Sequence, residues 1–175
     1  MLEFSRIHEV QAIRLFAQML RSRVGSPLSL ASIARDLAVS PATLKKYLDI
    51  LEALYIVFVV RPYHDNIARS VLQSPKVYFY DTGLLCTLLT LNSKDALKRH
   101  PRHGAIFENW CIAEIAKNRN NQGLSGGLYY FRDNAGNEID LITEKESGPQ
   151  AIEIKFSSKK DRHLLSGLKY WSKYQ

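Results

Sequence analysis

The fold is decided by the stretch NEIDLI at residues 137–142 together with AIEIKF at residues 151–156. Apolar residues recur through both stretches and turn residues bound them, which is typical of two adjacent β-strands. Pairing of Asp140 opposite Glu153 would bring two carboxylates within reach of one divalent cation, and Lys155 would share the face of Glu153. The pattern therefore predicts an acidic site with one amine, although an ordinary half-buried sheet can carry the same residues.

The residues before this pair of strands add a third carboxylate. A helix is expected over residues 103–119, and Glu108 falls within its apolar sector. Burial of an unpaired carboxylate costs several kcal/mol, so a metal, a basic residue or a backbone cap should meet Glu108. On its own strand, Asp140 is expected to share a face with Glu138 and Ile142.

Composition limits the classes of function. The 175 residues are 46% hydrophobic and carry a formal charge of +7, which favours a globular protein with a polyanionic partner. No apolar run is long enough for a membrane span and no signal-peptide pattern is present, so a cytoplasmic protein without a membrane partner is expected. The sequence has no phosphate-binding loop of the Gly-x-x-x-x-Gly-Lys-Ser/Thr type, so no nucleotide site is expected in this chain.

The first half predicts a winged helix-turn-helix within residues 1–91. A helix is expected over residues 7–23, and Ser29 and Ser40 cap two further helices before a strand at residues 55–60. In DNA-binding examples the second helix of the turn enters the major groove. Here that helix carries Lys45 and Lys46 as candidate phosphate contacts. Acidic neighbours offset them, so packing against another domain is an equally good use.

Three segments complete the expected organisation. A strand at residues 76–80 is followed by a helix that Asp81 caps, with pairing of Asp81 to an arginine as the alternative. Residues 92–102 are polar and basic enough to link residues 1–91 to a second domain at residues 103–175. The class is therefore α+β.

The last helix predicts a basic surface beside the acidic site. Leu164, Leu168 and Trp171 lie on its apolar side. The candidate nucleic-acid-binding residues at its start and on its opposite side are Lys159, Lys160, Arg162, Lys169 and Lys173. A phosphate backbone could bind there, but lysines on a solvated face give the same pattern.

These elements resemble the PD-(D/E)XK nuclease superfamily, which includes restriction endonucleases and Holliday-junction resolvases. The resemblance is carried by FEN at residues 107–109, EIDL at residues 138–141 and IEIK at residues 152–155. With the upstream winged helix, the chain resembles the C-terminal domain of predicted bacterial and archaeal AAA-type ATPases. The resemblance implies a restriction-endonuclease-like α-β-β-β-α core that is truncated at its C-terminus, because that core ordinarily ends with a further strand. It also implies an ATPase module upstream that this chain lacks.

The same resemblance implies roles for four residues. Asp140 and Glu153 would hold Mg²⁺ or Mn²⁺ and Glu108 would complete the site. Lys155 would orient or deprotonate the attacking water, which is how metal-dependent phosphodiesterases act.

Three functions remain open at this point. The first is a module that binds nucleic acid, most simply DNA, or a protein partner on behalf of an ATPase. The second is an active Mg²⁺-dependent DNA nuclease. The third is a winged-helix DNA-binding regulator, so the sequence does not decide whether the protein is an enzyme.

Overall fold

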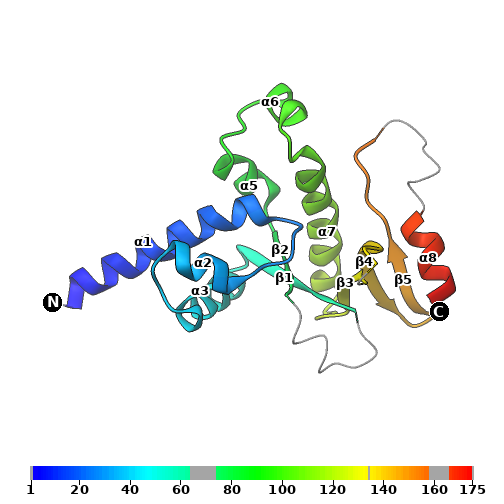
Figure 1. Cartoon of the computed structure of the whole chain (residues 1–175), viewed down its shortest axis with the longest axis horizontal. Helices are drawn as coiled ribbons and strands as arrows, with labels where there is room; N and C mark the ends of the chain where they lie inside the picture. Colours follow the sequence, from blue (N-terminus) through cyan, green and yellow to red (C-terminus); the bar gives the residue numbers. More distant parts are fainter. Residues whose placement is uncertain (1, 64–73, 134, 158–165, 175) are drawn as a thin grey trace.

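The computed structural model describes residues 2–63, 74–133, 135–157 and 166–174. These residues form an α+β fold with seven α-helices and one five-stranded mixed sheet. Figure 1 shows α1, α2 and α3 at one end of the molecule, α7 along the middle and α8 at the other end. None of the described helices is both long and apolar enough to cross a membrane.

Helices make up the first part of the chain. They are α1 (Leu2–Leu20), a 3₁₀ turn (Arg21–Arg23), α2 (Leu30–Asp36) and α3 (Pro41–Ala53). The Ser29 hydroxyl accepts a hydrogen bond from the Ser32 amide, and the Ser40 hydroxyl accepts one from the Thr43 amide. Both caps were predicted, because serine satisfies the free amides of a first helical turn.

One sheet joins the two halves of the chain. Its strands are β1 (Val57–Pro62), β2 (Lys76–Phe79), β3 (Leu128–Arg132), β4 (Glu138–Lys145) and β5 (Gly148–Ile152). Their order is β2-β1-β3-β4-β5, with β1 antiparallel to β2 and parallel to β3. Strands from both sides of the expected linker at residues 92–102 are therefore hydrogen-bonded together. That segment also contains a helix, α6 (Lys94–Arg99).

An irregularity in β4 decides where Asp140 points. Tyr129 pairs with Ile142 while Phe131 pairs with Ile139, so Tyr130 alone lies opposite both Asp140 and Leu141. Such a bulge breaks the simple alternation of side chains along a strand and re-aims one of them.

The packing on the two sides of β4 follows from this bulge. Leu141 packs with Ile112 of α7, whereas Ile139 and Ile142 pack with Trp171 of α8. The prediction that Asp140 shares a face with Ile142 is therefore wrong, because strict alternation fails at the bulge.

Four helices complete the described chain: α5 (Thr82–Leu88), α6, α7 (His103–Asn121) and α8 (Ser166–Tyr174). The Asp81 carboxylate accepts hydrogen bonds from the amides of Gly83 and Leu84, so Asp81 caps α5 as predicted. Asn109 of α7 is fully buried and bonds both the amide and the carbonyl of Phe79, which fixes α7 against β2.

The end of β5 differs from the prediction. Leu141 pairs with Ile152 at the end of the strand pair, so the predicted pairing of Asp140 opposite Glu153 falls just beyond β5. The strand itself ends at Ile152 and not at Phe156. The reason is local, because the Ile154 amide donates to the Asp140 carboxylate at 2.7 Å and so makes a side-chain bond in place of a strand bond.

Candidate functional site

Three of the four predicted site residues lie together. The Lys155 amine is 2.7 Å from Glu153 Oε1 and 3.4 Å from Asp140 Oδ2. We call Asp140, Glu153 and Lys155 the outer cluster. The Lys155 side chain is 45% exposed, whereas those of Asp140 and Glu153 are only 9% and 11% exposed. The cluster is therefore open to solvent on its lysine side.

The fourth predicted residue, Glu108, belongs to a second and deeper group. The Lys76 amine pairs with Glu138 Oε1 and lies 4.0 Å from Glu108 Oε1. The Tyr78 hydroxyl donates to Glu108 Oε1 at 2.7 Å. We call Lys76, Tyr78, Glu108 and Glu138 the inner cluster. Of the partners expected for Glu108, which were a metal, a basic residue or a backbone cap, the structure shows a basic residue, Lys76.

Lys76 and Glu108 are enclosed by protein, whereas Glu138 is 34% exposed and lies 4.0 Å from the Arg132 guanidinium. The Lys76 side chain is 1% exposed, and its amine lies 5.0 Å from the centre of the Tyr130 ring. Gly25, in the connection between α1 and α2, covers Glu108, since a Cβ atom on Gly25 would lie 3.1 Å from Glu108 Oε1. Gly25 also has a positive φ of 70°, which glycine adopts without strain. The Lys76 amine is therefore surrounded by protein atoms and has almost no contact with solvent.

Burial raises the pKa of two carboxyl groups at the site and of one tyrosine. Burial raises the pKa of Glu108, although Lys76 and the Tyr78 hydroxyl act in the opposite direction. Burial likewise raises the pKa of Glu153, against the effect of Lys155. Burial and the Glu108 charge raise the pKa of Tyr78 well above its usual range, so Tyr78 stays a hydrogen-bond donor.

Lys155 remains a cation. Burial alone would lower its pKa, but the hydrogen bond to Glu153 and the Asp140 charge outweigh burial and raise it above the ordinary value of 10.5. An amine with a raised pKa is a poor general base at neutral pH. Its chemistry here is that of a fixed positive charge.

Two carboxylates are the most that the described site offers to a cation. Among residues 2–63, 74–133, 135–157 and 166–174, no three His, Cys, Asp or Glu side chains form a group that could hold a metal. Glu153 Oε2 is nevertheless buried and has no hydrogen-bond partner there. Asp140 and Glu153 therefore fit a Mg²⁺ ion that keeps several waters, since Mg²⁺ is commonly held by one or two carboxylates. Glu108 is tied to Lys76 and Tyr78 instead.

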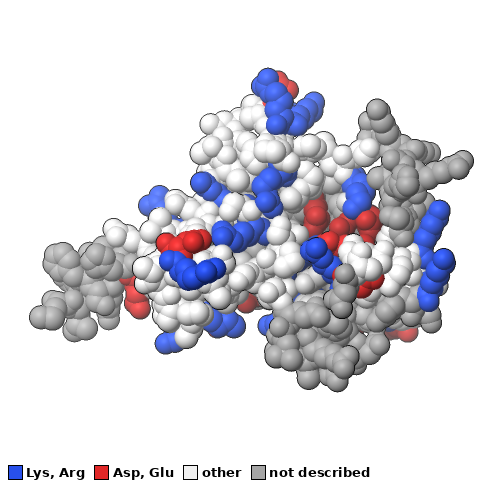
Figure 2. Space-filling view, in the orientation of Figure 1, with Lys and Arg blue, Asp and Glu red and all other residues white. Residues whose placement is uncertain are grey.

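The predicted basic residues fall into three groups. Lys169 and Lys173 are exposed on α8, and Lys45 and Lys46 are exposed on α3, where Lys45 pairs with Asp49. Lys159, Lys160 and Arg162 lie outside the described residues. Figure 2 shows acidic side chains gathered between α7 and α8, with blue side chains along the outer edge of α8.

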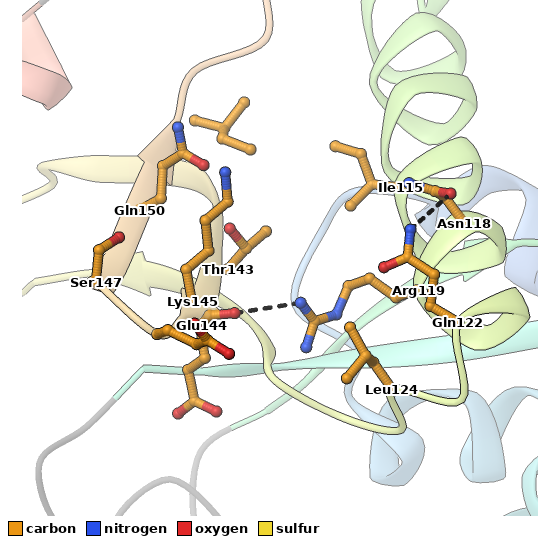
Figure 3. A pocket seen from close by; sticks show the side chains of 12 residues that line it. Ile115, Asn118, Arg119, Gln122, Leu124, Thr143, Glu144, Lys145, Ser147 and Gln150 are labelled. Carbon is orange, nitrogen blue, oxygen red and sulfur yellow. Dashed lines mark hydrogen bonds between the residues drawn. The ribbon is translucent and has the colours of Figure 1, made fainter.

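Another cavity lies away from the two clusters. It has a volume of about 750 Å³ and is formed by the second half of α7 and the β4–β5 hairpin. Figure 3 shows Arg119 directed toward the hairpin, where it donates to the Glu144 carbonyl at 3.2 Å. Arg119 also donates to the Gly126 carbonyl. None of the predicted site residues lines this cavity, and its arginine already holds two backbone segments together.

Sequence reasoning missed Lys76 and Tyr78 as site residues. They lie on alternate positions of β2 and so face the same side of the sheet. The available signal was a lysine in a strand that otherwise consists of apolar and aromatic residues. It pointed to a buried amine that would need carboxylate partners.

Comparison with known proteins adds family membership. Residues 1–95 match a domain of unknown function, DUF8612, and residues 103–175 match another, DUF4143. Two similar relatives are the uncharacterized proteins Mb2031c of Mycobacterium bovis and Rv2008c of Mycobacterium tuberculosis. Each is 36% identical over 140 residues, which is 80% of this chain and 31% of the relative. The chain thus spans about a third of the length of these relatives. No solved structure matches it. The chain belongs to the DUF8612 family, and its second part carries the DUF4143 match.

Proposed function

We propose that α7, β3, β4, β5 and α8 form a nuclease-like core that binds nucleic acid without cleaving it. The order of these elements along the chain is the α-β-β-β-α order of the PD-(D/E)XK core. Glu108, Asp140, Glu153 and Lys155 occupy the positions that this resemblance assigns to the active residues.

The observation that carries the proposal is that every carboxylate in the two clusters pairs with the lysine of its own cluster. Lys76 contacts Glu108 and Glu138, and Lys155 contacts Asp140 and Glu153. Carboxylates that are already neutralised by fixed amines attract a divalent cation less strongly. With Lys155 protonated, the outer cluster also lacks an amine base.

Exposed lysines on α8 supply the binding surface in this proposal. Lys169 and Lys173 lie on the solvent side of a helix that packs on β4 and β5 through Trp171. Their charges add to the formal net charge of +7. Binding of this kind is dominated by phosphate contacts and therefore weakens steeply with salt.

A salt titration tests the proposal. Binding of a fluorescent duplex and a fluorescent single strand would be followed by anisotropy for the 175-residue chain and for Lys169→Gln/Lys173→Gln. We expect the double variant to reduce the slope of log K against log salt by roughly 1.5 to 2. Lys45→Gln/Lys46→Gln removes the same charge from α3 and is the matched control.

The outcome of this control separates two surfaces. An unchanged slope for the α3 variant supports binding through α8. Loss of binding in the α3 variant alone would instead favour the winged-helix regulator. No binding to either nucleic acid at low salt would refute the proposal.

A metal-dependent nuclease is the second candidate. It is favoured by the buried Glu153 Oε2, which has no hydrogen-bond partner among the described residues, next to the Asp140 carboxylate. In that function Asp140 and Glu153 would hold the cation, which would activate water and stabilise charge on the phosphate. Cleavage of either oligonucleotide with added Mn²⁺ that disappears in Asp140→Asn and Glu153→Gln would replace the binding proposal.

The partner of this module is proposed on resemblance alone. We infer an AAA-type ATPase module as the unit that would act together with it.

A further inference from the structure

An apolar cavity beside the outer cluster has no part in the proposal above. It has a volume of about 340 Å³ and lies between α5, α6, α7 and the segment after β5. This volume is near the lower end of the roughly 300–1,000 Å³ typical of ligand pockets. The side chains that matter for its chemistry are His103, Phe107, Trp110, Phe156, Lys94 and Lys98.

Aromatic rings form one wall of the cavity. The ring centroids of Phe107 and Phe156 are 5.3 Å apart, those of Phe107 and Trp110 are 5.8 Å apart, and those of His103 and Phe156 are 5.2 Å apart. Trp110 is nevertheless 49% exposed and Phe156 is 51% exposed. Two large aromatic side chains at the surface, joined through a third, mark a binding site more often than a solvated surface.

Three residues of the cavity wall lie on one face of α7, the helix that also carries Glu108. His103, Phe107 and Trp110 recur at steps of four and three residues, so they share one face of α7. Glu108 adjoins Phe107 in the chain but points to the inner cluster, and Phe156 directly follows Lys155. The cavity and the outer cluster are therefore adjacent in the chain at Phe156 and Lys155.

The rim of the cavity has one sign of charge. Lys94 and Lys98 are exposed, lie four residues apart on α6 and line the cavity. Among the described residues that line it, none is acidic. The combination of flat aromatic rings and nearby amines is complementary to a planar group attached to an anion.

We propose that this cavity binds an unpaired base of single-stranded DNA, with the base on Trp110 or Phe156 and a neighbouring phosphate on Lys94 and Lys98. This inference rests on the proposed nucleic-acid-binding function and names its substrate as single-stranded over duplex. In a duplex each base is stacked between its neighbours, so its face is not available to a protein ring. A single strand offers that face freely.

Tryptophan fluorescence gives a direct readout. The sequence contains two tryptophans, so Trp171→Phe leaves Trp110 as the one reporter. Titration of this variant with an oligo-dT strand should quench its emission, because the base stacks on the indole ring. The same length of duplex should leave the emission nearly unchanged.

Anisotropy with labelled oligo-dT tests the residues and does not depend on the Trp171 variant. Trp110→Ala should weaken binding of the single strand roughly 10- to 100-fold, whereas Trp110→Phe should retain most of it. Lys94→Gln/Lys98→Gln should lower the salt slope by about 1.4. Tyr55→Ala removes an aromatic side chain that is 68% exposed outside the cavity and should have no effect.

The outcomes distinguish this inference from the function on which it rests. Equal binding of duplex and single strand, without quenching and without an effect of Trp110→Ala, overturns the inference and leaves DNA binding intact. In that case the cavity takes another class of partner, such as an apolar protein segment. Absence of binding to any DNA would overturn both this inference and the proposed nucleic-acid-binding function.

Discussion

The inner and outer clusters have the same charges, but their lysines differ in exposure. Each contains two carboxylates and one lysine, yet the Lys76 side chain is 1% exposed and the Lys155 side chain is 45% exposed. Water screens an exposed pair, whereas a buried amine depends on its partners for nearly all of its solvation. The difference indicates that Lys76 contributes more to the stability of the fold than Lys155 does.

Removal of each lysine should show the difference between the two clusters most clearly. Lys76→Met leaves the largely buried Glu108 without its cation, so we expect a loss of about 3–5 kcal/mol in the free energy of unfolding. Lys155→Met should cost less, about 1–3 kcal/mol, because Asp140 and Glu153 are buried but solvent reaches the position of the amine. Urea unfolding of both variants measures the difference. Equal losses would mean that the burial of Lys76 gives it no larger contribution to stability than that of Lys155.

Removal of the Tyr78 hydroxyl tests the inner cluster with a smaller expected loss of stability. Tyr78→Phe removes the hydrogen bond to Glu108 and keeps the ring, so a loss of roughly 1.5–3 kcal/mol is expected. The matched control is Tyr80→Phe, whose hydroxyl accepts an exposed bond from Asn120. This control should change stability by less than about 0.5 kcal/mol. A comparable loss in the two variants would argue against a special role for Glu108.

The contact between α8 and the clusters can be tested with a methyl group. A Cβ atom on Gly167 would lie 2.5 Å from the Glu138 carbonyl oxygen and 3.0 Å from Glu153 Oε2. Gly167→Ala should therefore cost roughly 1–3 kcal/mol through overpacking. A Cβ atom on Gly104 of α7 would meet nothing within 4 Å, so Gly104→Ala should be neutral or stabilise by up to about 1 kcal/mol. Thermal melts compare the two variants. A higher melting temperature for Gly167→Ala than for Gly104→Ala would contradict this prediction.

The smallest expected effect is a pH dependence. Because burial raises the pKa of Glu108, the folded protein binds this proton more tightly than the unfolded chain does. Its contribution to stability is therefore present below the ordinary value of 4.5 and is lost as the pH rises through the folded pKa.

Glu108→Gln should abolish this part of the pH dependence. The free energy of unfolding of the wild-type protein should fall relative to that of the variant as the pH rises above 4.5. Glu114→Gln, at a half-exposed position of the same helix, is the control and should give a curve parallel to the wild type. Parallel curves for Glu108→Gln as well would contradict a raised pKa.

Local chemistry was predictable from the sequence, and long-range pairing was not. The caps at Ser29, Ser40 and Asp81 each depend on residues no more than three positions away, so the sequence alone indicated them. The ion pair of Lys76 with Glu138 joins positions 62 residues apart. Such a contact depends on the order of the strands, which periodicity does not reveal.

The site was predicted in outline for the same reason. Asp140 and Glu153 were expected to meet if they paired across two adjacent strands, and the contacts of Lys155 with both carboxylates show that the three side chains lie together. The bulge at Asp140 escaped prediction, since no residue there carries a glycine-like signal. Glu108 was expected to meet a partner, but only the folded sheet identifies the partner as Lys76.

The parallel pairing of β1 with β3 has a consequence for any shortened form of the protein. Arg61 and Pro62 of β1 lie beside Tyr129 and Tyr130 of β3. A fragment limited to residues 103–175, the DUF4143 match, would leave β3 as an unprotected edge with free backbone donors and acceptors. Such an edge is a template for another chain, so the fragment should self-associate more readily than the 175-residue chain.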